Sequence, residues 1–345
     1  MAYLSSILTP RDIAISIGTS NTQVHINGHG VIFNEPTVVT IDCNGYTKKR
    51  DGHVVAVGYS AKKMLGRTPQ EMYAIRPIKK SIIVDFEGTI YLIKGLIEKV
   101  FSKSFFRKPR MILTVPAGIT EIESILYKNA ANGAEASETY LIQEPIAMMI
   151  GLGIDAFNST GQMIISAGGG VTNVSIVSFG KIIYNRSLRI GGEDMDEAVL
   201  SLVKDKHSLL IGENTAESVR YKLTTIVRNS DFDRVAIKGR SVFEGIPNMS
   251  YINNSEVQRV ADYYLNLIID AIRVSVESVP RELIGEVISN GIILSGGLSL
   301  MEGFKDLIEL EIGIPMIFMG DFHCAALGAS MVLKEPEKYE KILIL

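Results

Sequence analysis

One seven-residue pattern occurs twice in the chain, at residues 16–22 and 166–172. Both copies read S-x-G-x-x-x-T, follow a short apolar run and lead into an alternating stretch. That succession predicts a strand, a tight glycine turn and a second strand. Because glycine lets a backbone approach a ligand and expose its N–H groups, two such hairpins can hold a polyphosphate. One hairpin alone is ordinary structure, but two copies far apart in the chain predict two similar halves.

The composition is that of a folded chain with more than one domain. At 345 residues the chain is longer than one core usually serves, so we expect two domains. Hydrophobic residues make up 46% and charged residues 21%, which excludes a disordered chain, and the net charge of -3 gives no nucleic-acid signature. Mean hydropathy is +0.21, yet no apolar run reaches the ~18 residues of a membrane span. The apolar surplus predicts large cores, a subunit interface or a membrane-contact patch.

The cysteines and the first residues bear on the location of the protein. Cys43 and Cys324 lie in apolar surroundings without metal-ligand spacing, so both are predicted to be buried free thiols. Residues 1–10 have neither the basic start nor the long apolar core of a secretory signal, which predicts a cytoplasmic location. Their apolar residues recur at helical spacing, which leaves a short membrane-touching helix and a frayed terminus both open.

Apolar periodicity predicts strands and helices in alternation. The spacing predicts a helix over 85–101, a capping-box start to a helix at 120–123 and a long helix over 255–279. Strands that alternate with helices around hairpins predict an α/β protein with mixed sheets in layers. Two segments are interpreted as insertions: 37–60, which carries a small sheet, and 228–254, which is polar and predicted to be irregular.

Several motifs, in their order and spacing, resemble the bacterial actin MreB family, within the actin, Hsp70 and sugar-kinase superfamily. The resemblance runs over nearly the whole chain, from about residue 12 to residue 333. The stretches that carry it are Gly-Thr-Ser-Asn-Thr at 18–22, Asn-Glu-Pro at 34–36, Met-Leu-Gly-Arg-Thr-Pro at 64–69, Ala-Ile-Arg-Pro at 74–77, Leu-Ile-Gln-Glu-Pro at 141–145, Ile-Gly-Glu-Asn-Thr-Ala-Glu at 211–217 and Ser-Gly-Gly at 295–297.

This resemblance implies an actin-like two-domain α/β fold, with an RNase H-like core in each domain and a nucleotide cleft between them. The first domain would comprise residues 1–150 and about 320–345, with a small subdomain inserted at about 38–85. The second would comprise 151–319, with a small subdomain inserted at about 195–256.

The resemblance also implies a site for ATP or ADP. In the family the two hairpins cradle the phosphates, a Glu-x-x-Lys segment lies at the adenine, a Gly-Gly-x-Ser turn lies beside the nucleoside, and one residue orients the attacking water. That catalytic residue corresponds to Glu144. The residues implied to bind nucleotide are Gly18, Thr19, Ser20, Asn21, Gly168, Gly169, Gly170, Glu217, Ser218, Val219, Arg220, Gly296, Gly297, Leu298 and Ser299.

The phosphate site departs from the family in one direction. In the family each phosphate hairpin begins with an aspartate. In this chain the corresponding residues are serines, Ser16 in the first hairpin and Ser166 in the second. Val171 stands where the family has a threonine, and Asn173 and Gln143 stand where the family has acidic residues. Because a divalent metal on a triphosphate needs carboxylates, directly or through water, a bound Mg²⁺ is doubtful and we predict no protein ligand to a metal. The backbone cradle is retained, so we expect binding to persist while hydrolysis is weak or lost.

Several functions remain open at this stage. The first is an actin-like cytoskeletal protein that binds adenine nucleotide and polymerises into membrane-associated filaments for cell shape or motility, with ATP hydrolysis weak or lost. The second is a fully active MreB-type ATPase filament that tolerates the serines. The third is a chaperone or sugar kinase on the same fold, although a kinase base is not evident in the second hairpin. The fourth is a structural paralogue that binds no nucleotide.

The resemblance also implies partners. The family stacks its subunits head to tail, so the expected partners are further copies of this chain and paralogous MreB proteins, with no nucleic acid. Phe105 and Phe106 come just before Lys108, where the family has an apolar loop that inserts into the membrane. Two buried phenylalanines with adjacent cations favour anionic lipid, which predicts a peripheral location at the inner face of the cell membrane. Packing of these rings within the domain is the alternative.

Overall fold

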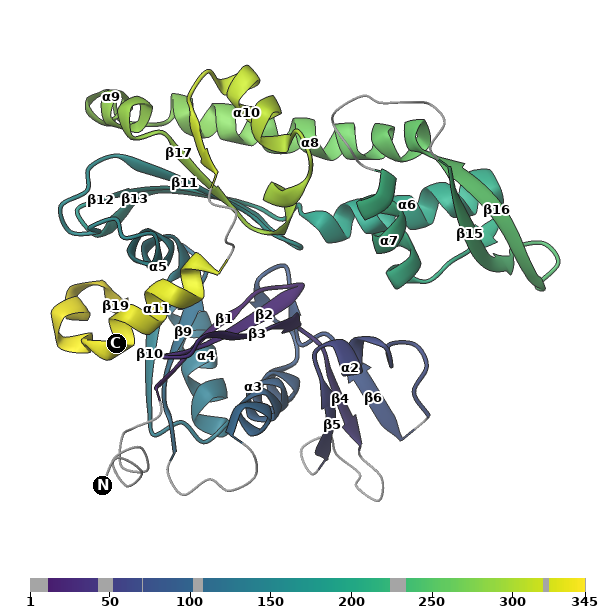
Figure 1. Ribbon diagram of the computed structural model, residues 1–345, viewed down its shortest axis with the longest axis horizontal. Helices are drawn as coiled ribbons and strands as arrows, with labels where there is room; N and C mark the ends of the chain where they lie inside the picture. The colour runs from purple at the N-terminus through teal and green to yellow at the C-terminus, as the bar shows by residue number, and fades with distance from the viewer. Residues whose placement is uncertain are drawn as a thin grey trace. The chain divides into compact units, whose positions relative to one another are not determined.

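The computed structural model describes residues 12–42, 52–69, 71–101, 108–223, 234–318 and 323–344. By contacts, the chain divides into two compact units (Figure 1). One unit comprises Met1–Thr160, Val177–Ile183 and His323–Leu345, and the other comprises Gly161–Ile176 and Tyr184–Phe322.

The first unit is built on a six-stranded mixed sheet in the order β19-β10-β9-β1-β2-β3. Strands β1, β2 and β3 form consecutive antiparallel pairs, and β9 and β10 run parallel to β1. The strands are β1 (Asp12–Ile17), β2 (Asn21–Ile26), β3 (Gly30–Pro36), β9 (Arg110–Val115), β10 (Glu138–Gln143) and β19 (Leu343–Ile344). Because side chains alternate between faces, Ile13, Ile15 and Ile17 enter one core.

Two layers of helices cover this sheet (Figure 1). Apolar side chains of α3 and α4 fill the core on the face of Ile13, and α5 and α11 pack together on β1 and β9. The helices are α3 (Phe86–Phe101), α4 (Glu121–Gly133), α5 (Glu144–Gly151) and α11 (Cys324–Lys334), and a 3-10 segment η3 (Pro336–Ile342) follows. The predicted helix over 85–101 is therefore confirmed. So is the capping box, in which the Thr120 side chain accepts from the N–H of Glu123 at 3.3 Å.

Helices α5 and α11 touch backbone to backbone. A Cβ on Gly328 would lie 1.8 Å from Ala147 O, and one on Gly151 would lie 2.0 Å from Cys324 O, so only glycine fits at either position. Cys324 is a buried free thiol, as predicted, whereas Cys43 lies outside the described residues.

A small sheet in the order β5-β4-β6 and a two-stranded hairpin fill much of the predicted insertion at 38–85. The elements are β4 (Val39–Asp42), β5 (His53–Val57), α2 (Tyr59–Lys62), β6 (Met72–Ile75), β7 (Ile78–Lys79) and β8 (Ile82–Ile83). Glu35 connects this part to the main sheet, because its carboxylate accepts from Tyr59 N at 3.0 Å and pairs with Lys99 of α3.

The second unit repeats the strand order of the first. Its main sheet has the order β13-β12-β11-β17-β18, with β17 parallel to β11 and β18 parallel to β17. The strands are β11 (Gln162–Ala167), β12 (Thr172–Ser178), β13 (Lys181–Leu188), β17 (Ile292–Ser295) and β18 (Met316–Phe318). In both sheets, three consecutive strands are followed by two parallel ones. The predicted repeat is therefore present in three dimensions, not only in the sequence.

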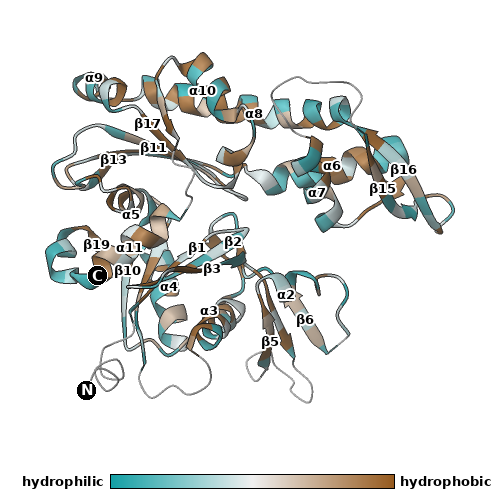
Figure 2. Ribbon diagram, in the orientation of Figure 1, coloured by the Kyte–Doolittle hydropathy of each residue, from teal (hydrophilic) through white to brown (hydrophobic). Residues whose placement is uncertain are grey.

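Hydrophobic residues line the central strands of this sheet and the side of α8 that covers it (Figure 2). The helices of the unit are α6 (Gly192–His207), α7 (Glu213–Leu223), α8 (Asn254–Glu277), α9 (Arg281–Asn290) and α10 (Phe304–Ile312), with a 3-10 turn η2 (Gly297–Leu300). Helix α8 corresponds to the long helix predicted over 255–279 and ends before Pro280.

The prediction of irregular structure over 228–254 is wrong for the part that the structure describes. A three-stranded sheet in the order β14-β15-β16 is formed by β14 (Leu209–Leu210), β15 (Arg234–Ser241) and β16 (Pro247–Asn253). Alternate residues, Val235, Ile237 and Ile252, enter a core with α7 and α8. The charged residues between them conceal this alternation in the sequence.

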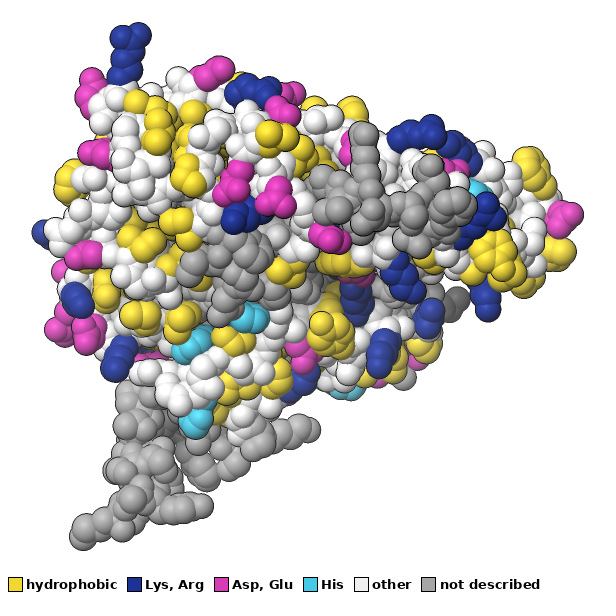
Figure 3. Space-filling view, turned by 45° about the horizontal axis from the view of Figure 1, so that its top comes forward, with side chains coloured by type: hydrophobic (Ala, Val, Ile, Leu, Met, Phe, Trp, Pro, Cys, Tyr) yellow, Lys and Arg dark blue, Asp and Glu magenta, His cyan; other side chains and the backbone are white. Residues whose placement is uncertain are grey.

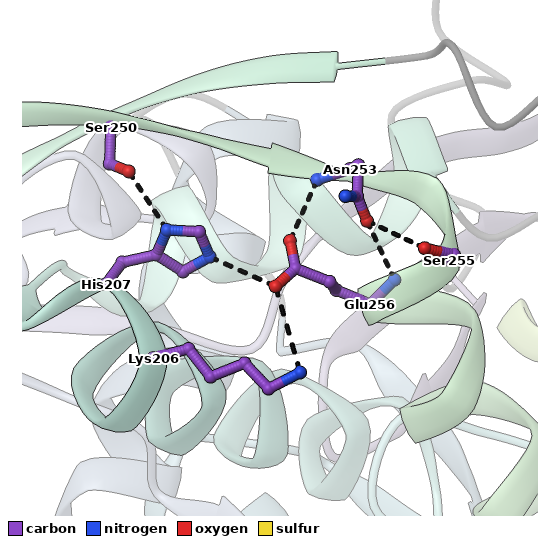
Figure 4. Close-up of polar contacts among 6 residues, drawn as sticks. All are labelled: Lys206, His207, Ser250, Asn253, Ser255 and Glu256. Atoms are coloured by element: carbon purple, nitrogen blue, oxygen red, sulfur yellow. Dashed lines mark hydrogen bonds and ion pairs between the residues drawn. The ribbon is translucent and has the colours of Figure 1, made fainter.

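Polar contacts tie this small sheet to α6 and α8 (Figure 4). His207, at the end of α6, has Nδ1 at 2.9 Å from Ser250 Oγ of β16 and Nε2 at 3.4 Å from Glu256 Oε1 of α8. Asn253 caps α8: its Oδ1 accepts from Glu256 N at 3.1 Å, and Glu256 Oε2 accepts from Asn253 N at 3.2 Å. One carboxylate thus holds three elements together.

Among the helices that the structure describes, none is long and apolar enough to cross a membrane.

Candidate functional site

The first glycine turn, residues 18–20, joins β1 to β2. Gly18 N donates to Asn21 O at 2.9 Å and closes the turn. A Cβ on Gly18 would lie 2.8 Å from the same oxygen, so the position requires glycine. The turn therefore has a fixed backbone, which is what a cradle made of N–H groups needs.

Residues from later in the sequence hold this turn through hydrogen bonds. Thr37 N donates to Ser20 O and Thr37 Oγ1 donates to Gly18 O, both at 2.8 Å. Ser81 N, in the turn between β7 and β8, donates to Thr19 Oγ1 at 3.0 Å. Sequence reasoning missed Thr37 and Ser81. The only signal for Thr37 is its position directly after the Asn-Glu-Pro motif.

The second glycine turn, residues 168–170, joins β11 to β12 and has the same closing bond. Gly168 N donates to Val171 O at 2.9 Å, three residues on, as Gly18 N does to Asn21 O. The two seven-residue patterns therefore fold alike. Val171, which replaces a threonine, is 7% exposed.

The start of α6 packs directly on the second turn. Gly192 N donates to Gly168 O at 3.2 Å, and Glu193 N donates to Gly169 O at 2.7 Å. The carbonyl groups of Gly168 and Gly169 therefore accept hydrogen bonds from the first residues of α6. Among the residues that the structure describes, no acceptor pairs with the N–H of Gly169 or Gly170. Two backbone donors in a glycine turn suit an anion such as a phosphate.

The turn at Gly296–Ser299 lies against the end of β11, beside the second glycine turn. Gly296 has φ +96, and a Cβ there would lie 2.3 Å from Ala167 O. Ser299 Oγ donates to Gly296 O at 2.6 Å and fixes the turn, while Leu298 is buried in the core of the unit. Gly297 has open space around the Cβ position. Two of the predicted nucleotide segments therefore lie together within this unit.

The predicted adenine segment, 217–220, lies on α7 and joins the same neighbourhood through Arg220. The Arg220 guanidinium, 5% exposed, donates to both carboxylate oxygens of Asp196 on α6, at 2.6 and 3.3 Å. Burial raises the pKa of Asp196, against the lowering effect of Arg220. Ser218 is exposed, whereas Val219 is 1% exposed and packs in the core of the small sheet.

Glu144 is the first residue of α5, directly after β10. Burial raises the pKa of Tyr127, and the carboxylates of Glu123 and Glu144 add to the effect. Tyr127 Oη donates to Ser81 O at 3.3 Å, and Ser81 N reaches Thr19 of the first turn. The predicted water-orienting carboxylate and the first turn thus share neighbours in one unit.

The two serines lie at matching strand ends. Ser16 Oγ accepts from Thr114 Oγ1 of β9 at 2.9 Å. Ser166, 8% exposed, lies opposite Ser295 of β17 in the parallel register. Where the family has carboxylates, both strand ends present hydroxyls, a poor donor set for Mg²⁺. Within the described ranges, no three His, Cys, Asp or Glu side chains form a group that could hold a metal ion.

Phe105 and Phe106 lie outside the described residues.

The repeated sheet, with a glycine turn after the first strand of each copy, defines an actin-like fold. Comparison with known proteins gives the family: the chain belongs to the MreB/Mbl family, whose profile, described as MreB/Mbl protein, matches residues 10–341. It is 35% identical over 332 residues to the cell shape-determining protein Mbl of Bacillus subtilis, covering 96% of this chain and 98% of Mbl. It is 37% identical over 327 residues to the cell shape-determining protein MreB of Escherichia coli, covering 94% of this chain and 93% of MreB.

Solved structures agree with this assignment. The crystal structure of MreB5 of Spiroplasma citri bound to AMPPNP matches with a TM-score of 0.84 at 26% identity, covering 96% of this chain and 98% of that one. The same protein bound to ADP matches with a TM-score of 0.85 at 25% identity, over 96% of this chain and 99% of that one.

Proposed function

We propose that this chain is a cytoskeletal protein that binds an adenine nucleotide and polymerises for cell shape or motility, with ATP hydrolysis weak or lost. The observation that carries the proposal is the pair of glycine turns with identical closing bonds, Gly18 N to Asn21 O and Gly168 N to Val171 O, both 2.9 Å. A relative of the same fold is bound to AMPPNP and to ADP, which supports an adenine nucleotide as the ligand.

The residues present fit a polyphosphate. Gly169 and Gly170 offer backbone N–H groups, and the first turn is held rigid by Thr37 and Ser81. The turn at 296–299 would lie beside the nucleoside. Gly169→Asp places a side chain and a negative charge in the phosphate space, so this variant is expected to lose binding of a fluorescent ATP analogue. Unchanged affinity would remove the second turn from the site.

The residues present are poorer ligands for the divalent metal ion that assists phosphoryl transfer. Transfer to water depends on cations and donors that stabilise the charge developing on the phosphoryl group. Ser16 and Ser166 supply no charge, and Val171 has no hydroxyl to hold a water. The chain is therefore expected to retain ATP far longer than a relative with both aspartates.

A second candidate function, the fully active ATPase filament, is favoured by one observation. Glu144, the residue that corresponds to the family's water-orienting carboxylate, remains as the first residue of α5, directly after β10. The variant Ser16→Asp with Ser166→Asp and Val171→Thr should release phosphate, and Glu144→Ala in that background should abolish the gain. Phosphate release by the parent at the rate of an active relative would select the second candidate.

Membrane attachment is a separate part of the proposal and depends on sequence alone. Phe105 and Phe106 would insert into the lipid, and Lys108 would favour anionic headgroups. Phe105→Ser with Phe106→Ser should abolish pelleting with anionic liposomes and leave nucleotide binding unchanged. Equal pelleting of the variant and the parent would refute this anchor. Further copies of the chain and paralogous MreB proteins are the proposed protein partners.

A further inference from the structure

A row of neutral polar side chains crosses the main sheet of the first unit at Ser16. In the register of the strands, Ser16 of β1 lies opposite Gln23 of β2, and Gln23 lies opposite Asn34 of β3. Residues directly opposite each other in antiparallel strands point to the same face, with Cβ atoms about 4.5–5.5 Å apart. Ser16, Gln23 and Asn34 therefore lie side by side, and we call them the amide row.

The amide row lies on the face of the sheet that α5 and α11 cover. Ile15 and Ile17 enter the core with α3 and α4, so Ser16, between them, points to the other face. Helix α11 packs on β1, β2 and β3 there. Ser16 is the last residue but one of β1, and the first glycine turn follows at 18–20. Since ligands of α/β sheets bind at the carboxyl ends of parallel strands, the amide row borders a place suited to a ligand.

Two oxygen atoms of the amide row are buried and have no partner. Among the residues that the structure describes, none donates a hydrogen bond to Gln23 Oε1 or to Asn34 Oδ1. Ser16 Oγ accepts one hydrogen bond, from Thr114 Oγ1 at 2.9 Å, and a hydroxyl oxygen has a second lone pair. Both amide side chains are half-buried, which leaves an entry path from solvent. Buried polar atoms without a partner call for a ligand such as a water or an ion.

A titratable neighbour of the amide row carries no charge at neutral pH. Figure 3 shows that histidine side chains gather on one part of the molecule, among hydrophobic and uncharged side chains. His25 follows Gln23 by two residues on the same face of β2, and burial lowers its pKa. The imidazole is therefore neutral near pH 7 and does not repel a cation.

The chemistry of these oxygens selects the kind of cation. Carbonyl oxygens can replace the hydration shell of K⁺ without any protein charge. Mg²⁺ gives up its water reluctantly and is bound through carboxylates, which the amide row lacks. The negative charge that a K⁺ ion needs would come from the phosphates of a nucleotide at the first glycine turn. ATP in turn needs a cation near its phosphates, because Ser16 supplies no site for a divalent one.

We propose that the amide row binds K⁺ beside the nucleotide phosphates. The inference rests on the proposed nucleotide site and adds a monovalent cation to it. Oxygen atoms of Ser16, Gln23 and Asn34 bind one side of the ion, and phosphate oxygens and water complete its shell. Because the ion and the nucleotide share this contact, each raises the affinity of the chain for the other by the same factor.

Nucleotide titrations in different salts test the K⁺ site. The Kd of a fluorescent ATP analogue should be about tenfold lower in KCl than in tetramethylammonium chloride at equal ionic strength, the factor expected when the ion is at ten times its own Kd. Gln23→Leu should abolish this difference. The matched control is Gln258→Leu on α8, since Gln258 Oε1 is also buried without a described partner but belongs to no such row. This control should keep the full dependence on K⁺.

A carboxylate of nearly the same shape tests the role of the amide oxygen. Gln23→Glu adds a negative charge to the amide row, so Mg²⁺ should now raise the affinity for the ATP analogue more than K⁺ does. A purely structural role of Gln23 would not change the preferred cation.

Crystals of the parent chain grown with ATP and Tl⁺ in place of K⁺ locate the ion directly. The anomalous signal of thallium should lie among the oxygens of Ser16, Gln23 and Asn34. A water alone at the amide row, or thallium only at other places, would overturn the proposal even if a variant fails to fold.

The outcomes separate this inference from the function on which it rests. A parent chain that binds no nucleotide in any salt would refute the proposed function, and the K⁺ site with it. Equal affinity for the ATP analogue in KCl and in tetramethylammonium chloride would refute the K⁺ site while the nucleotide site stands. A dependence on K⁺ that persists in a folded Gln23→Leu protein would also refute the assignment to the amide row.

Discussion

Gly191→Ala tests the link between α6 and the second glycine turn. Gly191 has φ -161, a backbone conformation that alanine adopts without strain, so only the added methyl matters. The added Cβ would lie 2.4 Å from Gly169 O, whereas real Cβ contacts are essentially never shorter than 3.0 Å. The turn or α6 must therefore shift by at least 0.6 Å, which is 3.0 Å minus 2.4 Å. A displacement approaching about 1 Å can cost about 100-fold, or ~2.7 kcal/mol. We therefore expect ATP affinity to fall by about 10- to 100-fold.

The assay is titration of each variant with a fluorescent ATP analogue, and the chain offers a matched control. Gly212 has no atom within 4 Å of its Cβ position, so Gly212→Ala adds the same methyl into open space. This control should bind like the parent. A Gly191→Ala protein that is folded by circular dichroism and binds ATP with the parent's Kd would refute the assigned role of the turn. Equal losses in both variants would refute the steric argument.

Three further predictions concern buried charge and the strand ends. Burial lowers the pKa of His25, so below about pH 6.5 the unfolded chain binds a proton that the folded chain does not. The Tm should therefore decrease as the pH is lowered below about 6.5. An equally steep decrease in His25→Gln would contradict this assignment. Asp196→Asn removes the carboxylate to which the buried Arg220 donates, and breaking this pair should cost about 3–5 kcal/mol in urea unfolding, whereas an unchanged midpoint would show that the pair is not needed. Ser16→Asp with Ser166→Asp should raise Mg²⁺-dependent phosphate release by about two to four orders of magnitude, and no gain despite bound ATP would place the defect elsewhere.

Features with a local cause could be predicted from the sequence. The two glycine turns follow from residue spacing alone, because their closing bonds join residues three apart. The capping box at Thr120 and the helix α3 follow from side chains within a few residues of one another. The actin-like fold came from the order of many such motifs.

Features that depend on distant partners could not be predicted. The hairpin of β15 and β16 was missed because its outward residues are charged and its inward residues, such as Ile237, gain their meaning only from α7 and α8. Likewise Asp196 and Arg220 are 24 residues apart, and Thr37 reaches back 19 residues to Gly18. No pattern within one segment shows either contact.

The nucleotide recovered from the pelleted polymer tests the central claim most directly. The parent chain is incubated with ATP and Mg²⁺, the polymer is sedimented, and the nucleotide in the pellet is identified by chromatography. We predict a pellet that contains about one adenine nucleotide per chain, as each chain has one pair of turns, and that this nucleotide is mainly ATP. A pellet rich in ADP, with phosphate in the supernatant, would show an active ATPase, and a pellet without nucleotide would contradict the site itself.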